Sequence, residues 1–118
     1  MSLDAEDAKI VTLARSARLR AYAPHTGITE GAAIRDTDGR TYAAATVENA
    51  DPALTVSALR AAVAAAASSG ARTFEAAALV TDADAVDLRD LAFLAEFGAT
   101  VPILLAGADG TVKDRDTA

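Results

Sequence analysis

A change of pattern after Val47 constrains the fold of this chain more than any other feature. The residues before it read as a strand, and those after it, up to about Ser69, form its most alanine-rich helical segment. Residues 49–52 break the strand, and the Thr55 hydroxyl can cap the helix by accepting hydrogen bonds from its first amides. Gly70 stands where we expect the residue that ends the helix in the left-handed backbone conformation. The chain therefore passes from strand to helix here, and alanine around much of the helix would let it be buried on several sides.

Periodicity and turn signals place the remaining elements. Pro24 ends an amphipathic helix, and Asp38-Gly39 favours a tight hairpin. Because Pro102 lacks an amide donor, its strand should start at an edge or a bulge. The expected elements are a helix at 4–20, strands at 31–35 and 41–47, a helix ending near 69, a strand at 75–81, a helix at 87–97, a strand at 101–106 and a short final strand at 111–113. This order predicts a single α/β domain over residues 1–118, with a mixed sheet of about five strands and helices on both faces.

Charge and cysteine content exclude several classes of function. The formal net charge of -6 argues against a nucleic-acid groove, which needs a clustered positive field. The chain holds no cysteine, so neither a disulfide nor a thiolate metal site can form, and its single histidine, His25, has no second histidine as a co-ligand. No apolar run approaches the length of a membrane span, and the N-terminus lacks a charged region followed by the apolar core of a signal peptide. We therefore expect a cytoplasmic protein.

Alanine makes up most of the hydrophobic excess, and this limits the core. A chain of 118 residues with 52% hydrophobic residues can close one core. Alanine buries little area per residue, although it allows backbones to approach closely. Such a domain gains from further burial, so we expect it to associate with copies of itself.

Four short sequence motifs resemble motifs of the small cytidine deaminases. They are, in order, Tyr22-Ala-Pro24, Gly31-Ala-Ala-Ile34, Asp38-Gly39 and Val47-Glu-Asn-Ala50. Each is weak alone, but their order and nearly their spacing match the family over about residues 10–82. The resemblance implies a cytidine deaminase-like three-layer α/β/α fold, a homotetramer or a dimer, and the zinc-dependent hydrolysis of cytidine to uridine.

The resemblance fails where the family carries its chemistry. There a helix begins with Cys-Ala-Glu-Arg, whose cysteine binds zinc and whose glutamate moves the proton; here it reads Ser57-Ala-Leu-Arg60. Zinc must acidify its water, and a positioned carboxylate must then carry the proton. Ser57 provides no thiolate at neutral pH and Leu59 carries no proton. Only Arg60, which supports the zinc-bound sulfur in the family, is kept.

The family's second motif, Pro-Cys-x-x-Cys, is also missing. Counting back from Asp109-Gly110 places Val86 and Arg89 at the two cysteine positions. The vestigial site positions are then Ser57, Leu59, Val86 and Arg89. We expect no catalytic residue, no metal ligand and no cofactor. A sharper hypothesis extends Arg89 into the former metal space, to meet Glu48 or Asp87; the alternative is a solvated arginine.

The residues that match the family's substrate pocket are better preserved. Ile28 stands where a phenylalanine packs on the base, and Thr46-Val-Glu48 stands for the Asn-x-Glu that holds the ribose hydroxyls. With Arg60, these residues form the candidate ligand-binding set. Glu48 has two readings: a sugar-binding carboxylate, or a structural residue that accepts backbone amides or pairs with an arginine.

Three functions from different classes follow. The first is a non-catalytic member of the family, a pseudoenzyme that acts through assembly or protein interaction. The alternative is the binding or sensing of a nucleoside or a related small molecule through Glu48, Thr46 and backbone groups. The third, an active zinc-dependent cytidine deaminase, is disfavoured by the missing ligands.

Overall fold

The fold is an α/β arrangement of helices around one sheet, seen in a computed structural model that describes residues 3–98 and 100–117. Its elements within these residues are α1 Ala5–Arg18, β1 Gly31–Asp36, β2 Thr41–Ala45, a 3₁₀ helix Pro52–Leu54, α2 Ala58–Ser68, β3 Phe74–Val80, α3 Leu88–Ala95, β4 Pro102–Ala106 and β5 Val112–Thr117. The predicted fold class is confirmed, and the final strand extends beyond the expected 111–113. Among these helices, none is long and apolar enough to cross a lipid bilayer.

The strands lie in the order β2-β1-β3-β4-β5 in a mixed sheet. β1 pairs antiparallel with both β2 and β3, and the hairpin turn uses Gly39 at a φ of +86°. β3 and β4 are parallel, as the crossover through α3 requires. β4 is an interior strand, and its register shift with β5 lies between Leu105 and Ala106, so Pro102 lies neither at the edge of the sheet nor at the bulge that were expected. Pro102 is tolerated because it is the first residue of the strand, one position before the register with β3 begins.

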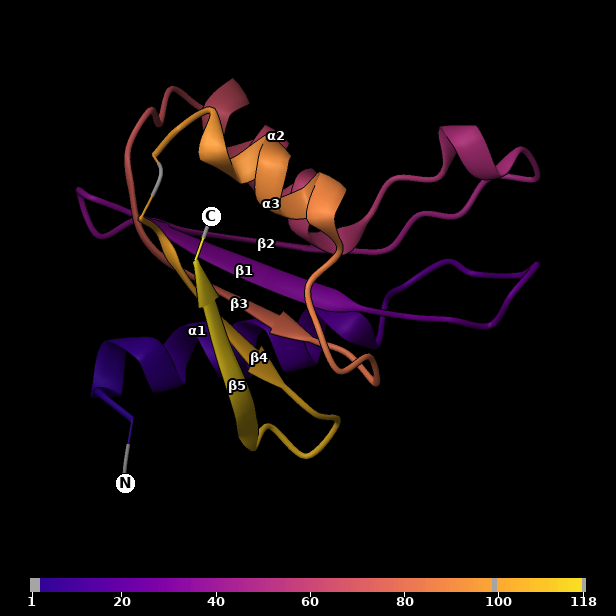
Figure 1. Ribbon diagram of the computed structural model, residues 1–118, viewed down its shortest axis with the longest axis horizontal. Coiled ribbons are helices and arrows are strands. Elements are labelled where there is room, and N and C mark those ends of the chain that lie inside the picture. Colours follow the sequence, from indigo (N-terminus) through magenta and orange to yellow (C-terminus); the bar gives the residue numbers. More distant parts are fainter. Residues whose placement is uncertain (1–2, 99, 118) are drawn as a thin grey trace.

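Helices cover the two faces of the sheet (Figure 1), with α1 on one face and α2 and α3 on the other. Alternation along β1 separates the layers: Ala32 and Ile34 pack towards α2 and α3, and Ala33 packs towards α1. α1 lies so close to β1 that a Cβ on Gly31 would stand 2.0 Å from the Ala14 carbonyl oxygen. The small residues of the Gly-Ala-Ala motif therefore determine how closely α1 packs on the sheet.

The start of α2 differs from the sequence expectation. The N-cap is Ser57, whose Oγ accepts from the Arg60 amide at 3.2 Å, while the Thr55 hydroxyl accepts from the Asn49 amide at 3.1 Å. Thr55 is too early because Val56 first pairs with Val47 in an isolated bridge, and the helix turns only afterwards. Within the single chain, α2 buries one face in the core and leaves Ala64 and Ala65 exposed.

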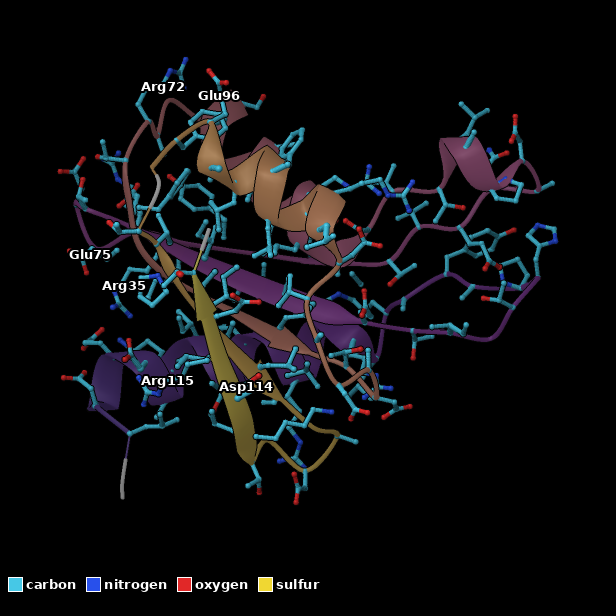
Figure 2. The ribbon with its side chains drawn as sticks, viewed as in Figure 1. Arg35, Arg72, Glu75, Glu96, Asp114 and Arg115 are labelled. Carbon is cyan, nitrogen blue, oxygen red and sulfur yellow. The ribbon has the colours of Figure 1, made fainter. Side chains whose placement is uncertain are left out.

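A buried arginine joins α1 to the sheet. Arg35 on β1 is 9% exposed, and it donates to Glu75 of β3 at 2.8 Å, to the Glu6 carbonyl at 3.0 Å and to Asp7 at 3.1 Å. Figure 2 shows Arg35 and Glu75 together at one end of the sheet. All three guanidinium nitrogens are paired, so this buried charge is compensated by hydrogen-bonded partners.

Candidate functional site

A pocket of about 420 Å³ lies where the starts of α2 and α3 meet the loops that follow α1 and β2. All four residues of the candidate ligand-binding set lie in its wall: Ile28, Thr46, Glu48 and Arg60. Among the described residues, its charged lining comprises Glu30, Glu48, Arg60, Asp87, Arg89 and Asp90. The size is within the range of small-molecule sites in proteins.

The inner wall is a cluster of three polar residues, Ser57, Arg60 and Asp90, which we call the clamp. The Ser57 hydroxyl donates to Asp90 Oδ1 at 2.8 Å, and Arg60 Nε lies 3.0 Å from both the Ser57 Oγ and the Asp90 Oδ1. Asp90 is 3% exposed, whereas the Arg60 side chain is 29% exposed. Burial raises the pKa of Asp90, although the Ser57 hydroxyl and the Arg60 guanidinium oppose this shift. The clamp ties the start of α2 to the first turn of α3.

Asp87 caps α3, and Arg89 lies outside the clamp. Asp87 Oδ1 accepts from the Arg89 amide at 2.8 Å, and this bond is the main cause of the lowered pKa of Asp87. Arg89 Nε lies 3.5 Å from the same carboxylate, but its side chain is 78% exposed. The guanidinium therefore reaches Asp87 from the solvent side and does not fill the space between the two helix starts. Arg60 is the arginine that lies there.

Glu48 holds the loop after α1. Its carboxylate accepts from the Thr26 hydroxyl, from the Thr26 amide at 3.1 Å and from the His25 amide. These bonds lower the pKa of Glu48, the Thr26 hydroxyl bond most of all. Both carboxylate oxygens are thus engaged by the protein, as the structural reading of Glu48 requires.

Thr46 and Glu30 form the pocket wall at the end of the β1–β2 hairpin. The Thr46 hydroxyl accepts from the Glu30 amide at 3.0 Å, and Glu30 Oε2 accepts from the Thr81 hydroxyl at 2.7 Å. Burial raises the pKa of Glu30, against the effect of the Thr81 bond. Ile28 lies at the rim with 69% of its surface exposed. The hydroxyl of Thr46 and one carboxylate oxygen of Glu30 are therefore already paired within the protein.

Two of the vestigial positions face the core instead of the pocket. Leu59 is 0% exposed and Val86 is 5% exposed, and both pack in the cluster between the sheet and the helices α2 and α3. Neither is among the pocket-lining residues of the described chain. Of the four vestigial positions, Ser57 and Arg89 line the pocket.

Comparison with known proteins identifies the fold. The family model described as cytidine deaminase-like matches residues 3–110. The chain belongs to the cytidine deaminase-like family. It is 31% identical over 116 residues to a cytidine deaminase of Sporosarcina psychrophila, covering 93% of this chain and 84% of that protein.

Solved structures agree with this assignment. The crystal structure of cytidine deaminase from Burkholderia pseudomallei superimposes with a TM-score of 0.82 at 29% identity, over 93% of this chain and 89% of that one. The cytidine deaminase from Mycobacterium leprae gives a TM-score of 0.82 at 25% identity, over 97% and 94% of the two chains. The match to the cytidine deaminase-like family model also extends past residue 82, where the similarity of the short motifs ended.

The family resemblance implies zinc, but the donors at this place do not suit it. The Ser57 hydroxyl donates a hydrogen bond to Asp90, while Arg60 donates to the same two oxygen atoms and brings a positive charge to them. Within residues 3–98 and 100–117, no three histidine, aspartate or glutamate side chains are placed to hold a metal ion. The Ser57 Oγ, the Asp90 Oδ1 and the Arg60 Nε that meet here are hydrogen-bonded to one another.

Sequence reasoning missed Glu30 and Asp90. Glu30 directly precedes the Gly-Ala-Ala-Ile motif, and this position beside the matched loop could have predicted its place in the pocket. Asp90 follows Asp87 by three residues, the same spacing as the two cysteines of the family's second motif. Reading that motif one residue later than Val86 and Arg89 would have pointed to both aspartates.

Proposed function

We propose that this protein is a non-catalytic member of the cytidine deaminase-like family, a cytoplasmic pseudoenzyme without a zinc cofactor that acts through assembly or protein interaction. The observation that carries the proposal is the clamp: the hydroxyl of Ser57 and the carboxylate of Asp90 are bonded to each other and to Arg60. Leu59 supports it, because a leucine buried in the core moves no proton.

Activity and metal content test this proposal together. The protein is produced in zinc-supplemented medium, and cytidine conversion to uridine is followed by absorbance beside the Burkholderia pseudomallei enzyme as a positive control. Zinc is measured by elemental analysis of the same sample. We expect no turnover above the protein-free blank and far less than one zinc per chain. Turnover of cytidine, or one zinc per chain, would overturn the proposal.

The assembly role is supported by an exposed apolar patch, Tyr22, Val47 and Val56. Val47 bridges Tyr22 on one side and Val56 on the other, and bridged partners share one face. The three side chains are 58%, 52% and 43% exposed, and contiguous exposed apolar residues are typical of protein interaction surfaces. We propose that copies of the chain meet here in a homotetramer or a dimer.

Light scattering after size-exclusion chromatography tests this assembly. Val47→Asp should shift the mass towards the monomer because it buries a charge at the contact. Leu19→Asp is the matched control, since Leu19 is equally apolar, 87% exposed and outside the patch. A monomeric wild-type protein, or equal effects of the two variants, would contradict the proposed contact.

A second function, the binding of a nucleoside or a related small molecule, is supported by the pocket itself. Its charged lining holds four carboxylates against two guanidinium groups among the described residues. This balance disfavours phosphate groups and favours neutral ligands. In a thermal-shift screen we expect cytidine or uridine to raise the melting temperature more than their monophosphates. A larger shift with the monophosphates would refute the charge argument, and no shift with any of them would remove this second function.

A further inference from the structure

We infer that the clamp does in this chain the structural work that the metal does in the family: Arg60 is a built-in cation that joins the starts of α2 and α3. The inference rests on the proposed absence of a zinc centre and adds how the two helices are held without it. It also assigns Ser57, Asp87 and Asp90 to the three positions of the family's ligands.

The placement of the side chains carries the assignment. Ser57 is the N-cap of α2, Asp87 is the N-cap of α3, and Asp90 lies one turn further along α3. Residues three apart share one face of a helix, so Asp87 and Asp90 both face the pocket. In the register one residue earlier, Val86 lies in the core and Arg89 lies in solvent, so neither side chain reaches Ser57.

Charge explains why a cation is needed at this point. The starts of two helices meet here, and the amides of each favour negative charge nearby. The two aspartates supply that charge, but Asp90 is 3% exposed and its burial as an anion is costly without a partner. Arg60 supplies the partner from α2 itself, at 3.0 Å from Oδ1. The same nitrogen also bonds Ser57, so one guanidinium connects both helices.

The clamp also occupies the oxygen atoms that a metal ion would need. The Ser57 Oγ and the Asp90 Oδ1 are hydrogen-bonded to each other at 2.8 Å and each lies 3.0 Å from Arg60 Nε, so both atoms would have to leave these partners to bind a metal. The clamp and a metal are therefore alternatives for one position, and stability should not depend on added zinc or on a chelator.

A double-mutant cycle in urea tests the clamp. Asp90→Leu or Arg60→Met alone should raise the unfolding equilibrium constant on the order of 100-fold, because each leaves one charge of a buried pair unpaired. The double variant R60M/D90L should recover most of that loss. Arg89→Met is the matched control, since this arginine is largely solvated and should change the constant by less than about threefold. Additive single effects, or a wild-type midpoint that moves with zinc or with a chelator, would overturn the inference.

Cysteine grafts test the assignment of positions. S57C/D87C/D90C should bind cobalt with the near-ultraviolet absorption of thiolate ligands, at one ion per chain, whereas S57C/V86C/R89C should not. Cobalt binding by the second set, or by neither while circular dichroism shows both folded, would refute the assignment. Should either graft fail to fold, the urea cycle decides the inference without it. Cytidine turnover by the wild-type protein would remove the proposed function but leave the urea cycle as an independent result.

Discussion

Placing the family's glutamate at position 59 should destabilise the protein, because the side chain at this position is packed in the core. Leu59 is 0% exposed, so its replacement loses about 2 kcal/mol of apolar burial. A glutamate held there would have its pKa raised by roughly three units, and at 1.36 kcal/mol per unit its ionised form costs about 4 kcal/mol more. We therefore expect Leu59→Glu to lose about 6 kcal/mol at pH 8, against a total of about 5–15 kcal/mol for a typical domain.

Urea unfolding at pH 5 and at pH 8 separates these two contributions. Leu59→Gln is the neutral control of similar shape, and its loss should be the same at both pH values. The loss for Leu59→Glu should be larger at pH 8 than at pH 5, because the folded state binds the carboxyl proton more tightly than the unfolded state. Equal stability of the two variants at pH 8 would refute the reasoning, since the carboxylate would then be reaching the water of the pocket.

Three further outcomes follow from the packing and the two carboxylates of the pocket wall. Gly31→Ala should destabilise the protein by about 3 kcal/mol or more in urea, because its Cβ would stand 2.0 Å from a carbonyl oxygen of α1; Gly107→Ala, which meets nothing closer than 3.7 Å, should not. Bonding to the Thr26 hydroxyl lowers the pKa of Glu48, so its stabilisation is present above the unfolded-state value and is lost as the pH falls through the folded-state value; Glu48→Gln should flatten the acid side of the stability curve. Burial raises the pKa of Glu30, so the opposite sign holds: stability is lost as the pH rises through its folded-state value, and Glu30→Gln should reduce that loss.

Local signals in the sequence predicted the elements well because turns and helix ends are decided by neighbouring residues. Asp38-Gly39 gave the hairpin, and Gly70 ends α2 with a φ of +107° as expected. The cap of α2 was predicted wrongly because Thr55 and Ser57 are both competent hydroxyl caps, and the Val47–Val56 bridge that chooses between them is a tertiary contact.

Alanine limited the prediction of which side of α2 is buried. A helix shows its inner face by contrast between apolar and polar residues, and α2 offers little contrast. Ala62 and Ala66 are buried while Ala64 and Ala65 are exposed, although the four side chains are identical. Only the position of the sheet distinguishes them, and that position is a property of the whole fold.

The pocket was predictable on one side only. Thr46 and Glu48 follow a hairpin of fixed length, so their positions relative to the matched motifs could be predicted. The start of α3 follows a turn whose length no local signal fixes, so an error of even one residue in a count from Asp109-Gly110 would pass into every position of that helix. An error of one residue turns a helical side chain by about 100°, which is enough to exchange a clamp residue for a core or a solvent residue.

Arg60 explains how the two helices can keep their arrangement in a chain that has no cysteine ligands. A metal centre between two helix starts is also a cross-link, and its loss would leave buried polar groups with no partner. Arg60 matches the arginine of the family's motif, and here it forms a direct ion pair with the Asp90 carboxylate. Buried ion pairs often add little stability over an apolar pair, and we expect this one to act by fixing the relative position of the groups that it joins. On this inference, the clamp holds α2 and α3 in register beside the pocket.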